Sequence, residues 1–81
     1  MNNNEITFEI TEKIGVLENY TTGWNKEINM VSWNGNPPKY DIRDWSPDHS
    51  HMSRGITLTE DQMGRLIKHI IGSQDDDTPF N

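Results

Sequence analysis

The chain has 81 residues, a formal net charge of −6, 31% apolar residues and no cysteine. Its length allows one small domain with a thin core, which excludes a multidomain enzyme and favours self-association, while the lack of cysteine excludes disulfides, cysteine zinc sites and a thiol nucleophile. No apolar run approaches the roughly 18–20 residues of a membrane span and no signal peptide is recognisable, so we expect a cytoplasmic protein without a membrane partner.

Four segments carry the pattern of apolar and polar residues that indicates β-strands. The first alternates with a period of two, and Glu12 is its one polar residue at an inward position, where it marks a bend or an edge. In the second, the apolar parity changes between Met30 and Val31, which suggests a bulge or a change of partner. The segments span residues 6–16, 24–33, 39–45 and 55–58.

A helix follows the fourth strand. Thr59 and Gln62 have the spacing of a capping box, and an apolar stripe begins at Met63 and recurs at i+3, i+4, i+7 and i+8. Gly72 fits the residue that ends a helix. Four strands followed by one helix predict an α+β fold with an antiparallel sheet, β-β-β-β-α. We expect a flexible arm at residues 1–5, the domain at residues 6–72 and a disordered acidic tail at residues 73–81.

In the third strand, two cations and a tryptophan ring occupy odd-numbered positions, so they lie on one face of the strand. Tyr40 and Ile42 share the other parity, which we assign to the core. Rings interleaved with cations suit a single-stranded nucleic acid, because unpaired bases stack on rings and cations meet phosphates. The negative net charge argues only weakly against this, since a nucleic-acid-binding groove needs basic residues on one face of the protein alone. The alternative is that the tryptophans fill the core. The outward face would carry Lys39, Asp41, Arg43 and Trp45, with Asp41 orienting Arg43.

Two motifs resemble the positive-cofactor-four family of transcriptional coactivators, and more closely its bacterial YdbC-like branch. They are DIRDW at residues 41–45, an Asp-Ile-Arg-acid-aromatic strand, and RGITL at residues 54–58, a basic-Gly-Ile-Thr-Leu strand that leads into the capped helix. The resemblance covers about residues 6–71. It implies a curved four-stranded sheet followed by a helix, pairing as a homodimer, and single-stranded DNA binding in transcription or DNA maintenance.

The resemblance also implies which residues contact nucleic acid. Asn34 and Asn36 stand where relatives often have basic residues, a departure that would weaken phosphate binding. The positions that match, or lie close to, family contact residues are Lys26, Trp33, Lys39, Arg43, Trp45 and Arg54.

Catalytic and metal-binding patterns are weak. The loop Asp48-His49-Ser50-His51 contains a His-x-His pair without further defined ligands, so we interpret it as a solvated loop. Asp41 and Asp44 fall on opposite faces of one strand and cannot act as a catalytic pair. No nucleophile elbow or phosphate loop is present. We therefore expect no enzyme activity, no metal and no cofactor.

The C-terminal segment QDDDTPF at residues 74–80 resembles the acidic tip of bacterial single-stranded-DNA-binding proteins. There the tip presents a phenylalanine to an apolar pocket and aspartates to a basic rim on replication, recombination and repair enzymes. Asn81 departs from that pattern, because the bacterial tip ends on the phenylalanine. The alternative is a solubilising acidic tail. The residues expected to bind partners are Asp75, Asp76, Asp77, Pro79 and Phe80.

Three functions are compatible with these features. The first is a dimeric single-stranded DNA-binding protein of transcription regulation or of DNA replication and repair. The second is a protein-interaction module with core tryptophans and an acidic surface that binds a basic partner. The third is single-stranded RNA binding on the same platform, which the sequence does not separate from DNA binding.

Overall fold

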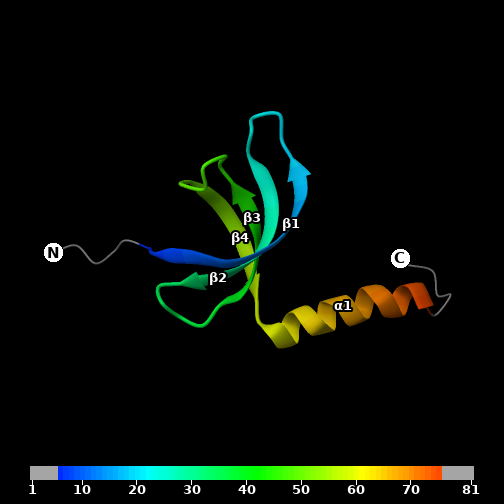
Figure 1. Cartoon of the computed structure of the whole chain (residues 1–81). Helices are drawn as coiled ribbons and strands as arrows, with labels where there is room; N and C mark the ends of the chain where they lie inside the picture. Colours follow the sequence, from blue (N-terminus) through cyan, green and yellow to red (C-terminus); the bar gives the residue numbers. More distant parts are fainter. Residues whose placement is uncertain (1–5, 76–81) are drawn as a thin grey trace.

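The computed structural model describes residues 6–75. It contains one antiparallel sheet with the strand order β1-β2-β3-β4, followed by a single helix (Figure 1). This is the predicted α+β order of elements, although the fourth strand starts three residues earlier than expected. The elements are β1 Phe8–Asn19, β2 Asn25–Trp33, β3 Lys39–Trp45, β4 Met52–Leu58 and α1 Glu60–Asp75.

The start of α1 is as predicted. The backbone N–H of Gln62 donates to Oγ1 of Thr59 at 3.1 Å, and the N–H of Thr59 donates to Oε1 of Gln62 at 2.9 Å, which completes the capping box. The predicted end is wrong, because the helix runs through Gly72 to Asp75. Gly72 does not take the positive φ of a terminating residue. A glycine inside a helix costs about 1 kcal/mol relative to alanine, which does not by itself stop the helix.

Strand β1 is bent by bulges. Its register against β2 shifts after Ile10, after Lys13 and after Val16, and each shift moves the following side chains toward the other face. The simple alternation predicted for this strand therefore fails beyond Ile10. The apolar residues of its second half are about half exposed; they are Ile14, Val16 and Leu17.

The first bulge accounts for two features of the sequence. Glu12 follows the shift, as expected for a residue that marks a bend, and it pairs with Met30. The step from Met30 to Val31 lies directly opposite this bulge. The irregularity predicted within β2 is therefore in β1, and β2 pairs with β3 without any shift in register.

The two faces of the sheet are not buried as predicted. Tyr40 and Ile42 were assigned to the core but are only half-buried, whereas Asp41 and Trp45 on the other parity are fully buried. The strands bend strongly in Figure 1, and rings from β1 and β3 meet across β2 on the parity of Trp45. That face is therefore the inner one. The buried residues are Val31, Trp45 and Met63, together with Glu27, Asn29, Asp41 and Ser46.

Helix α1 covers little of the sheet. It extends away from β4 in Figure 1, and its contacts with the sheet are confined to β3 and β4. Met63 is its buried anchor. No helix among residues 6–75 is long and apolar enough to cross a membrane. The predicted apolar stripe is real but about half exposed along Leu66, Ile67, Ile70 and Ile71, with Ile56 of β4 similarly exposed.

Candidate nucleic-acid interface

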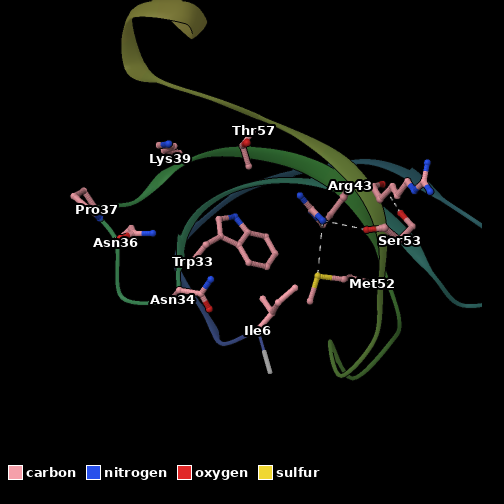
Figure 2. A pocket seen from close by; sticks show the side chains of 11 residues that line it. Ile6, Trp33, Asn34, Asn36, Pro37, Lys39, Arg43, Met52, Ser53 and Thr57 are labelled. Carbon is pink, nitrogen blue, oxygen red and sulfur yellow. Dashed lines mark hydrogen bonds between the residues drawn. The ribbon is translucent and has the colours of Figure 1, made fainter. Parts of the chain in front are cut away.

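A cavity of about 690 Å³ opens at one end of the sheet. Its walls come from Ile6, two positions before β1, and from the end of β2, the β2–β3 loop and the facing parts of β3 and β4 (Figure 2). Two of the six predicted contact residues, Lys26 and Trp45, are not among its lining residues. The four that the fold brings together there are Trp33, Lys39, Arg43 and Arg54.

The indole of Trp33 lies in the middle of this cavity (Figure 2). It is half-buried and ends β2, just before a turn in which Asn34 and Gly35 take positive φ values of 53° and 78°. The ring of Phe8 lies 5.8 Å from it, centre to centre. Within the described residues, the buried Nε1 of Trp33 has no hydrogen-bond partner. The cavity thus contains an aromatic surface of the kind on which an unpaired base stacks.

Arg43 is held by three hydrogen bonds to oxygen. Its Nε and Nη2 donate to the two carboxylate oxygens of Asp41 at 2.7 and 2.8 Å, and its Nη1 donates to the carbonyl of Ser53 at 3.1 Å. The prediction that Asp41 orients Arg43 is therefore confirmed. The Arg43 side chain is 13% exposed and that of Asp41 is fully buried, so this is a bidentate pair shielded from water.

The glycine of the RGITL motif has a steric role beside this pair. Gly55 is the register partner of Arg43. A Cβ added at Gly55 would collide with Cβ of Arg43 and with the carbonyl oxygen of Ile42. Strand β4 therefore approaches β3 at a distance that only glycine permits.

Lys39 and Arg54 supply the accessible positive charge. Both side chains line the cavity and both residues are exposed. Neither forms an ion pair with a carboxylate in the part of the chain that the structure describes. The positive charge of Arg43, in contrast, is largely neutralised by its ion pair with Asp41. The cavity therefore combines one half-buried ring with two cations available to an anionic ligand.

Trp45 does not lie on an exposed platform, and that prediction is wrong. Its side chain is fully buried, with the ring of Phe8 at 5.1 Å and that of His49 at 5.4 Å between centres. The loop after β3 folds back over it, because Ser46 donates its N–H to the carbonyl of His51 and accepts the N–H of His49. For Trp45 the core interpretation is correct. Through Phe8, it supports the ring of Trp33.

Lys26 lies on the other face of the sheet. Its Nζ is 3.1 Å from Oδ1 of Asp44, and the hydroxyl of Tyr20 donates to the same oxygen at 3.1 Å. The hydrogen bond to Asp44, with a smaller contribution from Tyr20, raises the pKa of Lys26. The structure does not bring Lys26 to the cavity. Asp44 and the buried Asp41 are on opposite faces, as the alternation predicted.

A buried polar cluster that the sequence analysis missed lies on the inner face. Nε2 of His49 is 3.0 Å from each carboxylate oxygen of Glu27, and Nδ2 of Asn29 donates to Oε1 of Glu27 at 3.2 Å. Burial works to raise the pKa of Glu27, but the bonds from His49 and Asn29 outweigh it and lower that pKa. The sequence contained one signal for this cluster: residues 27 and 29 are odd-numbered positions of β2 and therefore lie on the same face as Trp33.

The loop from Asp48 to His51 is accordingly not a solvated loop throughout. His49 takes a positive φ of 61° and its ring is directed at Glu27 and Trp45. His51 is exposed, as expected. Among residues 6–75, no three side chains of histidine, aspartate or glutamate are grouped so that they could hold a metal ion.

Comparison with known proteins identifies the family. Residues 20–69 match the model of the family described as Transcriptional Coactivator p15 (PC4), which is more than half of the chain. The chain belongs to the PC4 family. The matched region contains the four predicted contact residues at the cavity, whereas Ile6 and Phe8 lie before it. In general this family is one of single-stranded DNA binding and transcriptional coactivation.

One relative is similar over most of its length. An uncharacterized protein from Treponema pallidum (strain Nichols) is 46% identical over 64 residues, which cover 79% of this chain and 75% of that protein. The similarity therefore extends over more than three quarters of this chain.

Proposed function

We propose that this protein binds single-stranded DNA at the cavity around Trp33. An unpaired base stacks on the indole, while Lys39 and Arg54 contact the neighbouring phosphates. The observation that carries this proposal is the placement of a half-buried ring beside two exposed cations that have no carboxylate partner among the described residues. A duplex hides the faces of its bases, so this arrangement favours single strands.

Arg43 has a different part in this proposal from the one its charge suggests. A guanidinium has five N–H donors, and three of them are engaged with Asp41 and Ser53. Nη1 also donates to Sδ of Met52 at 3.9 Å, so four of the five donors have partners within the protein. Arg43 holds the indole of Trp33 in place, and one donor is left for a phosphate in the cavity that it lines.

We also propose that the working form is a homodimer. The exposed apolar stripe of α1 and the exposed Ile56 of β4 leave a small domain with three buried apolar side chains among its described residues. Burial of this stripe against a second copy would supply the core that one copy lacks. Ile67, Ile70 and Ile71 would then lie at or near the interface.

The process served by DNA binding is transcription or DNA replication and repair, and the acidic tail is the feature that bears on the choice. Asp75 ends α1, while Asp76, Asp77, Pro79 and Phe80 lie outside the described residues. If this tail docks on a replication or repair enzyme, the process is DNA replication and repair. Deletion of residues 76–81 should abolish capture of such enzymes and tighten DNA binding at low salt, since the anionic run competes for the groove. If the deletion changes neither the capture of these enzymes nor the affinity for DNA, the tail is a solubilising segment only.

The test of the main proposal is a titration with labelled oligo-dT, duplex DNA and single-stranded RNA at several salt concentrations. We expect oligo-dT to bind more tightly than the duplex and to quench tryptophan fluorescence, with the quenching lost in Trp33→Ala. Equal or tighter binding of RNA would assign the cavity to RNA instead. Absence of any oligonucleotide binding at low salt would overturn the proposal and favour a protein-interaction module.

A further inference from the structure

Two hydrogen bonds fasten the residue before β1 to the turn after β2. The backbone N–H of Asn34 donates to the carbonyl of Thr7 at 2.8 Å, and the N–H of Thr7 donates to the side-chain Oδ1 of Asn34 at 2.9 Å. Asn34 reaches this position in the left-handed conformation, which asparagine tolerates better than most residues. Thr7 and Asn34 are 27 residues apart in sequence, and their pairing places the segment before β1 beside the cavity.

The consequence is the position of Ile6. Its side chain lines the same cavity as the Trp33 indole and Met52, and Figure 2 shows all three side chains. Ile6 is 67% exposed, more than any other large apolar side chain among the described residues. A lone exposed isoleucine means little. This one is fixed by the Asn34–Thr7 pair at the edge of a cavity that contains an aromatic ring and two exposed cations.

We propose that Ile6 and Trp33 are the two walls of a slot that takes a single unpaired nucleobase. This rests on the proposed function, and it adds the occupant and a second wall. A base is flat and apolar on both faces, so a slot that covers both faces removes more of it from water than a ring on one side. The neighbouring phosphates then meet Lys39 and Arg54.

The orientation of the Asn34 amide specifies the preferred base. Because Oδ1 accepts from Thr7, the opposite side of the planar amide presents Nδ2, and Figure 2 shows this nitrogen on the Trp33 side. Nδ2 is a donor only. Between the two pyrimidines, it suits the C4 position of thymine, which carries a carbonyl oxygen, rather than that of cytosine, which carries an amino group. Asn34 thus presents to the cavity a group that can read a base edge.

The first test compares oligo-dT affinities of Ile6→Ala, Asn34→Gly and the double variant, with Ile14→Ala as the matched control on β1 outside the cavity. Glycine keeps the positive φ at position 34 and removes the Asn34–Thr7 side-chain bond. We expect each single variant to weaken binding about fivefold. The double variant should be weaker than either single variant but by less than the product of the two effects, because Asn34 acts partly through Ile6 and partly through its own Nδ2, and the salt dependence should not change. Ile14→Ala should bind like the unaltered chain.

The second test compares oligo-dT with oligo-dC in Asn34→Asp. Aspartate keeps the acceptor for Thr7 and replaces the donor by an acceptor, and its added charge cancels in the ratio of the two affinities. We expect the preference for dT to fall or reverse. An unchanged ratio would overturn the base-edge role of Asn34.

Wild-type affinity in Ile6→Ala, together with lost affinity in Trp33→Ala, would overturn the slot while leaving the proposed function intact. Failure of the unaltered chain to bind oligo-dT would overturn both.

Discussion

The guanidinium carbon of Arg43 lies 4.7 Å from the centre of the Trp33 ring. A cation over an indole is attracted by the negative face of the ring, by about 0.5–2 kcal/mol depending on its exposure to water. Because Asp41 fixes the guanidinium, the position of the indole depends on a carboxylate that is fully buried. The position of the candidate base-binding surface thus depends on an ion pair whose carboxylate is fully buried.

Asp41→Asn should lower the free energy of unfolding by about 3 kcal/mol or more, because it leaves the charge of a buried Arg43 without its counterion. Asp44→Asn is the matched control on the exposed face, where the loss should stay within about 1 kcal/mol. Urea denaturation of both variants measures this. Equal losses in the two variants would contradict the structural role of Asp41.

Trp45→Ala should destabilise the domain by about 3–5 kcal/mol, because it empties a fully buried site between Phe8 and His49. Trp33→Ala should instead reduce oligo-dT affinity by about 1–3 kcal/mol with a smaller effect on folding. Thermal unfolding and fluorescence titration separate the two effects, and Trp45→Phe provides a milder variant that stays folded. A folded Trp45→Ala with a specific loss of DNA affinity would return Trp45 to the binding surface.

Lys39→Ala and Arg54→Ala should each reduce the slope of log affinity against log salt by about 0.7, the value for one lost phosphate contact on a single strand. Lys26→Ala removes the same charge on the other face of the sheet and should leave the slope unchanged. The slopes come from oligo-dT titrations between low and physiological salt. A flatter slope in Lys26→Ala would mean that the strand also crosses the outer face.

Asp48→Asn should destabilise the domain at neutral pH and make no difference near pH 2. Hydrogen bonds from Ser50, and then from Ser46, lower the pKa of Asp48 from 3.8 to about 2. A carboxylate with a lowered pKa stabilises the folded state above its unfolded pKa, and this contribution fades as pH falls from about 4 to about 2. The gap in melting temperature between the two proteins, followed over this range, measures it. A gap that does not depend on pH would exclude this origin.

Ile70→Glu should convert a homodimer into a monomer, because it places a charge on the exposed apolar stripe of α1. His69→Glu introduces the same carboxylate at an exposed neighbouring position outside the stripe and should leave the dimer intact. Sedimentation at micromolar concentration distinguishes these outcomes. A folded monomer of the unaltered chain under those conditions would refute the dimer.

The sequence alone determined the features that depend on near neighbours in the chain. Thr59 and Gln62 are three residues apart, and their capping box forms as expected. Asp41 and Arg43 are two residues apart on one strand, so alternation places them on one face, where they pair. The bounds of β3 follow from the same local pattern. Such features follow from the fixed periods of strands and helices.

Only the tertiary structure decided which face of the sheet is the inner one. Bulges in β1 and the bend of the strands turn the parity of Trp45 inward, which buries that ring and leaves Tyr40 and Ile42 half-buried. The position of Ile6 depends likewise on a hydrogen bond that spans 27 residues of sequence. Curvature and long-range contacts arise from the register between strands distant in sequence, and residue periodicity within one strand does not record that register.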